Sequence, residues 1–326
     1  MKSYSLTALC LCTIIGAGFA TGRELVTYFV NYGIYGFVGI ALSSLLFGIS
    51  IYLIINSPYT SIKELTENKL PRQIAFVADK IVFLFLIVIY SAMLAAGGEV
   101  LGQMFNLDKN ICSALSGVVC LVIISCGTEV LTELSKILII PMAIIILAIG
   151  HYTTGVDITS PPENIFTLKT VTSPIIYLSY NMITAIALIV TLPKAENPRN
   201  VALQTGVGIF ILALVLSLPL YTHYGVVANE ALPLMAILIE GSKLRFFYIM
   251  LLLFAILTTA VSNGYSAVLF LPKGIPTIIR CVVLTIVAYL LSLIGFSSIV
   301  DKVYFIFGIA GMMLLYCLIN IKNKKS

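Results

Sequence analysis

The sequence predicts an all-α polytopic membrane protein with ten transmembrane helices. Of the 326 residues, 60% are hydrophobic and only 10% are charged, whereas charged residues make up about a quarter of a typical soluble domain. The apolar residues occur in runs of about 20, the length that an α-helix needs to cross the hydrocarbon core of a bilayer. Only short polar segments separate these runs, so we expect residues 1–326 to form a single transmembrane domain.

The ten predicted spans follow one another along the whole chain. They cover residues 5–29, 34–55, 80–105, 111–127, 131–151, 172–193, 201–223, 245–270, 276–295 and 299–320. The first span lacks a small-residue cleavage site followed by a polar mature sequence, which a secretory signal would have. We therefore expect it to be retained as a membrane helix.

The positive charges predict the orientation of the chain. Most of its 19 Lys and Arg residues fall in the segments that a cytoplasmic amino terminus would place inside the cell. Short cytoplasmic loops carry such an excess of Lys and Arg, so we expect both termini to be cytoplasmic. This bias also accounts for the formal net charge of +5, and nothing in the sequence calls for a nucleic-acid partner.

Two halves of five spans each are predicted, approximately 1–151 and 172–326. A polar external stretch, 152–171, joins them. An odd number of spans in each half gives the halves opposite orientations in the membrane, which is the topology of transporters built from inverted repeats.

The first span is interrupted in its apolar sequence. Residues 15–24 read IGAGFATGRE, with three glycines and the adjacent charges of Arg23 and Glu24. Non-helical backbone at membrane depth is tolerated only where it is buried in protein or lines a watery cavity. The sequence therefore indicates a broken helix with a binding site. The alternative is close packing of straight helices through small residues, because Gly18 and Gly22 are four residues apart.

The sixth span carries a second irregularity at the corresponding place in the other half. Pro174 is followed by a polar cluster, Ser179-Tyr180-Asn181, in a helix otherwise rich in Ile and Leu. Interruptions at corresponding positions of two halves point to a solute site near the middle of the membrane. We therefore expect both the first and the sixth helices to be interrupted, with hydroxyl and amide groups available to a solute.

Charged residues within the spans are candidates for gating or coupling. Arg23 and Glu24 project about 100° apart on a helix, so at least one of them points into the bundle. Glu99 lies beside two glycines in the third span and could serve proton coupling or recognition of a cationic amine. A structural ion pair for Arg23, and a position near the lipid headgroups for Glu99, are the simpler alternatives.

Two motifs resemble a known family. The stretch 16–24, followed by YGIYGF at 32–37, resembles YkvI-type bacterial membrane proteins of the amino acid–polyamine–organocation superfamily, which has the LeuT fold. Glu133 to Pro141, with Asn164 beyond it, resembles the fifth span of the neurotransmitter:sodium symporters. The resemblance implies a LeuT-like protein of the bacterial cell membrane, with a 5+5 inverted repeat and secondary transport by alternating access.

The resemblance also implies a cation site and an external gate. Ala255, Thr258 and Thr259 have the spacing with which sodium symporters hold their cation, and the carbonyls of Cys12 and Ile15 stand at the corresponding positions of the first span. The alternative is that the two hydroxyls bond back to carbonyls one turn earlier. Arg23 is expected to close an external gate against Asp301.

The sequence therefore predicts a secondary transporter for a small amino acid-like or organic solute, coupled to Na⁺ or H⁺ and without another cofactor. Its partners are the solute and the membrane lipid, and no feature indicates an oligomeric state. A solute-sensing receptor subunit on the same fold, similar to germinant receptors, remains the alternative. No catalytic motif indicates an enzyme. The expected solute ligands are Gly16, Ala17, Gly18, Thr21, Ser179, Tyr180 and Asn181.

Overall fold

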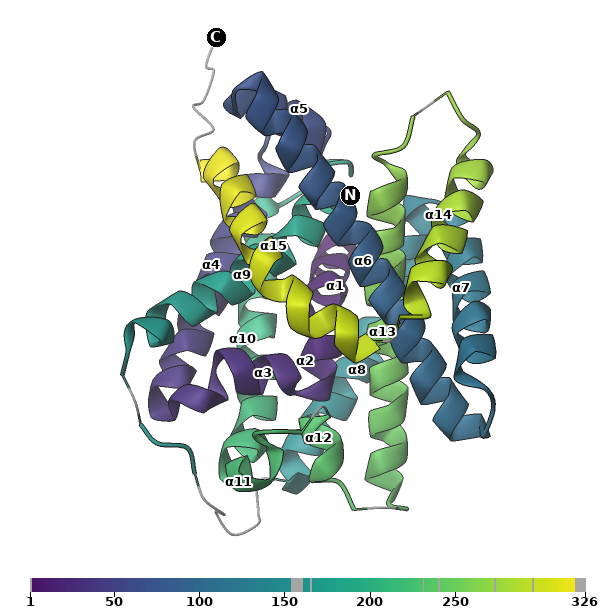
Figure 1. Cartoon of the computed structure of the whole chain (residues 1–326). Helices are drawn as coiled ribbons and strands as arrows, with labels where there is room; N and C mark the ends of the chain where they lie inside the picture. Colours follow the sequence, from purple (N-terminus) through teal and green to yellow (C-terminus); the bar gives the residue numbers. More distant parts are fainter. Residues whose placement is uncertain are drawn as a thin grey trace.

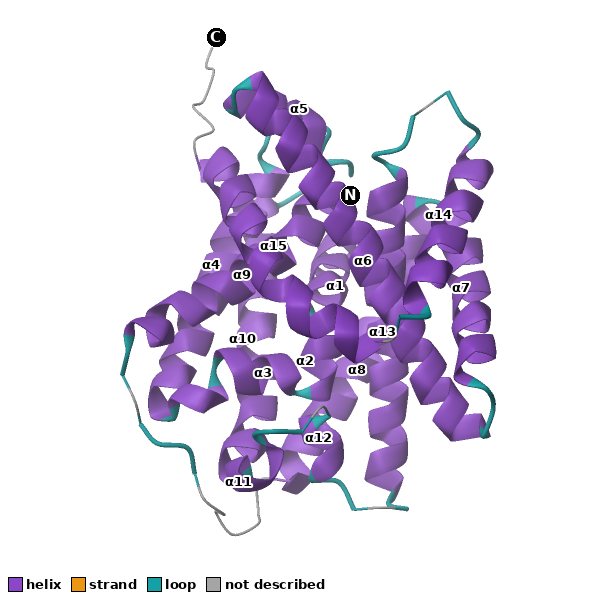
Figure 2. Ribbon diagram, in the orientation of Figure 1, coloured by secondary structure: helices purple, strands orange, loops and turns teal. Residues whose placement is uncertain are grey.

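The computed structural model describes residues 2–153, 161–164, 166–230, 232–239, 241–272, 274–294 and 296–319, with the backbone alone for 296–306. All regular structure in this part of the chain is helical (Figure 2).

Six helices in the described ranges are long and apolar enough to cross a membrane. They are α4 (Ile34–Ile55), α6 (Arg72–Phe105), α8 (Thr128–Thr153), α9 (Leu168–Ile189), α10 (Pro198–Thr222) and α13 (Lys243–Val268). Shorter apolar helices complete the bundle: α1 (Ser3–Ile14), α7 (Lys109–Ser125), α14 (Thr277–Ser292) and the final turns of α15 (Phe296–Ile319). In chain order these elements correspond to the ten predicted spans.

The first span consists of three short helices. After α1, the chain forms α2 (Ala17–Thr21) and α3 (Arg23–Tyr28), and a 3-10 turn (Val30–Tyr32) leads to α4. Gly22 has φ +82 between α2 and α3, a left-handed conformation that glycine adopts without steric cost. The turn redirects the chain, so α3 runs across the bundle whereas α1 runs along it (Figure 1).

The C-terminal end of α3, the helix that runs across the bundle, is attached to α9. The Ser173 hydroxyl donates a hydrogen bond to the Tyr28 carbonyl over 2.9 Å. The Tyr28 ring also lies 5.6 Å from the ring of Tyr177 and 5.7 Å from that of Tyr180, between centroids. Aromatic pairs at such distances attract one another beyond the effect of area burial.

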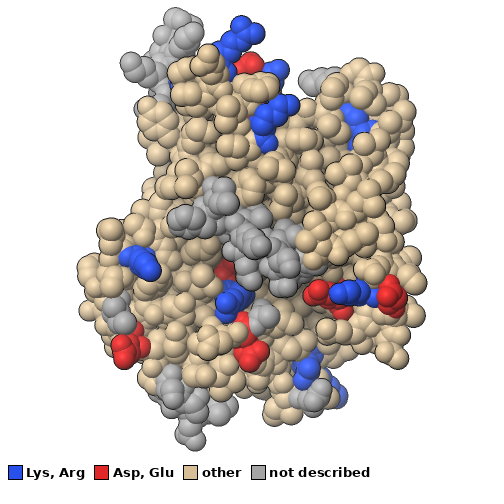
Figure 3. Space-filling view, viewed as in Figure 1, with Lys and Arg blue, Asp and Glu red and all other residues tan. Residues whose placement is uncertain are grey.

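The centre of the bundle is occupied by α1, which packs against α8, α9, α10 and α13. Most of α1 is buried, which explains why its apolar residues show no one-sided pattern. The outer faces of the surrounding helices are apolar and exposed, as in Ile137 and Leu203. On the face that Figure 3 shows, the described charged side chains gather in two zones, with a belt of uncharged residues between them. This arrangement is that of an integral membrane protein.

The interruption predicted in the sixth span is not observed. A continuous helix, α9, runs from Leu168 to Ile189 with Pro174 inside it. The segment has no glycine, and its polar side chains bond back to the helix: Ser179 Oγ donates to the Ile176 carbonyl and Asn181 Nδ2 to the Tyr177 carbonyl, each over 2.9 Å. These bonds satisfy the side chains without any unwinding of the backbone.

Short helices lie at opposite ends of the bundle. α5 (Ile62–Lys69) lies at the end where α1 begins and α15 ends, whereas α11 (Tyr224–Val227) and α12 (Pro233–Ala236) lie at the other end (Figure 1). The start and the finish of the bundle are thus on the same side, as cytoplasmic placement of both termini requires. The orientation itself stays a prediction.

Candidate functional site

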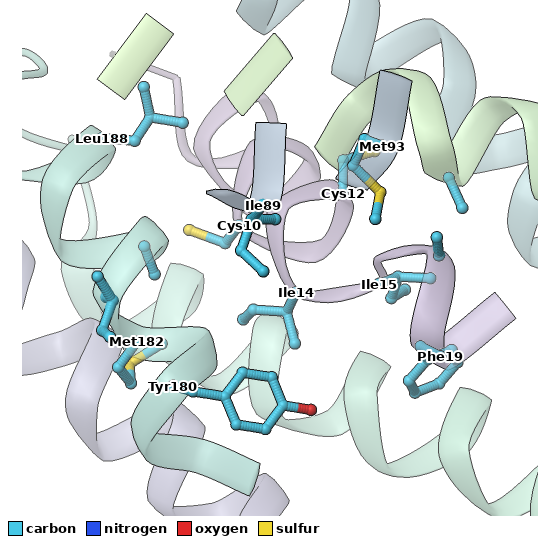
Figure 4. Close-up of a cluster of buried hydrophobic side chains, with 14 of the residues drawn as sticks. Cys10, Cys12, Ile14, Ile15, Phe19, Ile89, Met93, Tyr180, Met182 and Leu188 are labelled. Atoms are coloured by element: carbon cyan, nitrogen blue, oxygen red, sulfur yellow. The ribbon is translucent and has the colours of Figure 1, made fainter. Parts of the chain in front are cut away.

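The break in the first span exposes main-chain oxygen atoms at the centre of the bundle. The last helical hydrogen bond of α1 runs from Ile15 N to the Leu11 carbonyl over 2.8 Å, and Gly16 N then bonds to the Ile14 carbonyl in a tight turn. The carbonyls of Cys12 and Thr13 follow the Leu11 carbonyl in the chain, after the last helical hydrogen bond of α1. Figure 4 shows the break at Ile14 and Ile15 with side chains of α6 and α9 on either side of it.

A small cavity of about 30 Å³ adjoins the break. Because about 10–15 Å³ suffices for one water molecule by this measure, the cavity accepts a group of only a few non-hydrogen atoms. Its walls come from the break itself and from α3, α6, α9 and α13: Thr13, Gly16, Ala17, Gly18, Glu24, Phe85, Ile89, Met93, Tyr180, Asn181, Thr184, Thr259 and Asn263.

Glu24 supplies the carboxyl group of this cavity. It lies in the first turn of α3. The left-handed conformation of Gly22 bends the chain so that this first turn lies over α2. The Glu24 side chain packs directly on Gly18, where any Cβ would overlap its carboxyl oxygen. Glu24 is only 7% exposed, and Tyr180 lines the same cavity. Gly18 is therefore needed for the close approach of Glu24 to the helix break.

A chain of hydrogen bonds links α9 and α13 beside the cavity. Thr184 Oγ1 donates to Asn263 Oδ1 over 2.8 Å, and Asn263 Nδ2 donates to the Thr259 carbonyl over 2.8 Å. On α1, Thr13 Oγ1 donates to the Leu9 carbonyl over 2.7 Å. Our sequence analysis missed Thr13, Thr184 and Asn263. Asn263 carried a usable signal, because an amide in an otherwise apolar span needs a buried partner.

Five of the seven predicted solute ligands line the cavity, and the other two lie elsewhere. Gly16, Ala17 and Gly18 form the break, and Tyr180 and Asn181 approach from α9. Thr21 ends α2, bonds to the Gly18 carbonyl over 2.9 Å and lines a different cavity. Ser179 Oγ donates to the Gly308 carbonyl of α15 over 2.8 Å, so its hydroxyl joins two helices.

The two threonines of the predicted cation site differ in their surroundings. Thr258 Oγ1 bonds back to the carbonyls of Phe254 and Ala255 over 3.0 and 3.1 Å. Thr259 Oγ1 is buried and has no hydrogen-bond partner among the described residues. A Cβ on Gly16 would lie 3.0 Å from this oxygen, which means that Thr259 is directed at the helix break.

A larger outer cavity of about 270 Å³ lies between α2, α6, α12 and α13. Glu99 and Arg245 line it, together with Thr21. Ala17 lines both cavities, so α2 separates the outer cavity from the inner one. Glu99 thus lies on the approach to the break rather than in the inner cavity.

Arg23 points away from the inner cavity and toward the end of the bundle that carries α11 and α12. Its Nη1 donates to the carbonyls of Ala228 and Glu230 over 3.1 and 3.2 Å, and these carbonyls follow the last turn of α11. The predicted gate partner, Asp301, has its side chain outside the described residues. The two adjacent charged side chains of the first span therefore point in different directions. Arg23 points toward α11, and Glu24 points into the inner cavity.

Replacing Arg23 with Met should loosen the segment that contains α11 and α12. The substitution keeps the length and apolar part of the side chain and removes two charge-assisted hydrogen bonds, each worth about 1.5–3 kcal/mol. We expect limited proteolysis to cleave residues 224–238 several times faster in the variant than in the wild type. An Arg199→Met variant, altered at an exposed site on α10, is the control. Equal cleavage rates in all three proteins would contradict the anchoring role of Arg23.

The bundle and its broken first helix define a membrane protein with the LeuT fold, as the resemblance implied. Solved structures agree over nearly the whole chain: MhsT in complex with L-phenylalanine has a TM-score of 0.70 at 16% identity, covering 96% of this chain and 87% of that one. A nucleobase-cation-symport-1 family transporter, Mhp1, gives 0.70 at 11%, covering 97% and 77%. A Na⁺-coupled sialic acid symporter gives 0.69 at 11%, covering 98% and 78%.

Sequence comparison confirms the resemblance to YkvI-type proteins. The membrane protein YkvI of Bacillus subtilis (strain 168) is 23% identical over 324 residues, covering 94% of this chain and 92% of the relative. The protein YyaD of the same organism is 23% identical over 330 residues, covering 95% and 94%. No family model matches the chain.

Proposed function

We propose that the chain is a secondary transporter that moves a small amino acid-like or organic solute by alternating access. The observation that carries this proposal is the pair of cavities on either side of α2. The inner cavity is polar at the helix break, and the outer one extends to the segment that contains α12. A solute could pass from one to the other if α2 moves. The transporters of similar fold support this function, and we propose that the chain is a single domain with repeats at 1–151 and 172–326.

The proposed coupling site for Na⁺ lies between the break and α13. Its oxygen atoms would be the carbonyls of Cys12, Ile15 and Ala255 and the hydroxyls of Thr258 and Thr259. Hydroxyl and carbonyl oxygens suit a hard cation, and the buried, unpartnered Thr259 hydroxyl supports the fit. The alternative coupling ion is H⁺, for which the carboxyl groups of Glu24 and Glu99 are available.

Uptake into liposomes that contain the purified protein tests the proposal. A panel of amino acids and amines would be offered with an inward gradient of Na⁺, an inward gradient of H⁺, or neither. Accumulation driven by one of the gradients is the expected result. Binding of a solute without any uptake would instead favour the receptor function.

Replacing both Thr258 and Thr259 with Ala should weaken the response to sodium. Each lost oxygen ligand removes about 1–1.5 kcal/mol, so we expect the Na⁺ concentration for half-maximal uptake to rise about 10-fold or more. Thr132→Ala is the control, because Thr132 is also buried and bonds back to a carbonyl, that of Thr128, over 2.8 Å. If the sodium concentration has no effect on uptake in the wild type or in the variants, the Na⁺ site is disproved and proton coupling is favoured.

A further inference from the structure

The inner cavity contains a buried carboxyl group that has no basic partner among the described side chains. No Lys, Arg or His is found among the described residues that line it. The ion pairs of the described chain, Lys63–Glu67 and Lys136–Glu133, involve other carboxylates, and Arg23 is bonded to main-chain carbonyls at the outer end. A buried charge is costly unless an opposite charge and hydrogen bonds accompany it. A cationic ligand would supply that charge.

Four side-chain donor groups around the cavity form hydrogen bonds with other protein atoms. The amide nitrogens of Asn181 and Asn263 and the hydroxyls of Thr13 and Thr184 all donate to other protein atoms. The remaining polar groups include the Glu24 carboxylate, the main-chain oxygens at the break and the Thr259 hydroxyl. The buried carboxylate among them favours a ligand that donates hydrogen bonds.

A carboxylate on the ligand would meet repulsion at the break. Glu24 packs directly on Gly18 and so places its own negative charge beside the start of α2. Two carboxylates in a small, poorly hydrated space repel each other strongly. This arrangement disfavours a zwitterion as well as an anion.

The opposite wall of the cavity is apolar. Phe85, Ile89 and Met93 line it from α6, and the rings of Tyr177 and Tyr180 lie 5.8 Å apart behind the polar wall. A bare metal ion would be surrounded by oxygen atoms, whereas an alkylammonium ion has an apolar part that fits against these side chains. The volume of about 30 Å³ restricts that part to a few carbon atoms.

Resting on the proposed transport function, we infer that the solute is a small primary amine without a carboxyl group, held with its ammonium group at Glu24 and its alkyl chain against α6.

Melting temperatures of the purified full-length protein in detergent at pH 7 provide the first test. The additives are propylammonium chloride and methylammonium chloride, with alanine, potassium propionate and potassium chloride at matched ionic strength. A ligand that binds only the folded state raises the melting temperature, so among these additives we expect a shift with the two amines alone. A shift with alanine but not with the amines would overturn the inference.

A Glu24→Gln variant tests the assigned contact. Loss of the charged partner should weaken propylammonium binding about 100-fold or more. Glu67→Gln, which removes an exposed carboxylate of a surface ion pair, should leave the affinity within about 3-fold. If Glu24→Gln does not give a monodisperse protein, Glu24→Asp takes its place and should bind about 10-fold more weakly, because its shorter side chain withdraws the carboxylate. Unchanged affinity in either Glu24 variant would overturn the inference.

Uptake separates this inference from the proposed function. Glu24-dependent binding of propylammonium without uptake would support the inference and contradict transport. Uptake of alanine that propylammonium does not inhibit would support transport and overturn the inference. Uptake of propylammonium that alanine does not inhibit would support both.

Discussion

Replacing Gly18 with Ala should reduce solute binding by about 100-fold or more and leave the membrane fold intact. A Cβ at this position would overlap the Glu24 carboxyl group, so Glu24 would have to leave the cavity wall. Displacing a buried charged group from its ligand costs about 3–5 kcal/mol, whereas overpacking of a buried site costs about 1–3 kcal/mol of stability. A Gly18→Leu variant, with a larger side chain, should abolish binding.

The readout is the melting-temperature shift produced by whichever amine or amino acid stabilises the wild type. Gly274→Ala serves as the control, because nothing lies within 4 Å of the added Cβ there. Gly16→Ala should have a smaller effect than Gly18→Ala, since its Cβ would meet the Thr259 hydroxyl at 3.0 Å. Normal binding by Gly18→Ala would rule out the close approach of Glu24 to the break as a requirement for binding.

Replacing Gly311 with Ala should prevent the bundle from closing between α9 and α15. The added Cβ would overlap the main-chain carbonyl of Ser179, and a helix backbone cannot move aside as a flexible side chain can. The hydrogen bond from Ser179 Oγ to the Gly308 carbonyl would be lost as the helices separate. We expect destabilisation of at least about 3 kcal/mol and little monodisperse protein on size exclusion.

Gly117→Ala is the matched control for Gly311→Ala. Gly117 is also buried in a membrane helix, α7, but its added Cβ would have its nearest neighbour at 3.6 Å, an ordinary contact. Because Ala favours a helix over Gly by up to about 1 kcal/mol, this variant should melt at the wild-type temperature or slightly above it. Equal yields and melting temperatures for the two variants would contradict the close contact between α9 and α15.

The ten spans could be predicted from sequence because each apolar run has the length of a membrane helix. The break at Gly16 could also be predicted, since glycines and charges at membrane depth are unfavourable in a helix that serves only as an anchor. The same reasoning failed at Pro174, where a proline and polar side chains suggested an interruption. There the side chains bond to the carbonyls of their own helix, and the absence of glycine keeps α9 continuous.

The sequence alone could not predict that the Glu24 side chain points into the inner cavity. Both Arg23 and Glu24 are charged and adjacent, and the left-handed turn at Gly22 decides which of them faces the cavity. That turn, and the contact of Glu24 with Gly18, depend on the placement of α3 in three dimensions. Thr184 and Asn263 were missed for a similar reason, because their hydrogen bond joins residues 79 positions apart in the chain.

The turn at Gly22 also determines which parts of the protein move together. Because α3 is fastened to α9 through Tyr28, a displacement of α9 would carry Glu24 with it, whereas α1 could tilt about the break at Gly16 without moving that carboxylate. The main-chain oxygens of the break and the acidic side chain would then approach or separate as the two bodies rotate. Such a rotation would change the affinity of the cavity, so in the proposed transport cycle the solute would be held firmly in one orientation of the bundle and released in another.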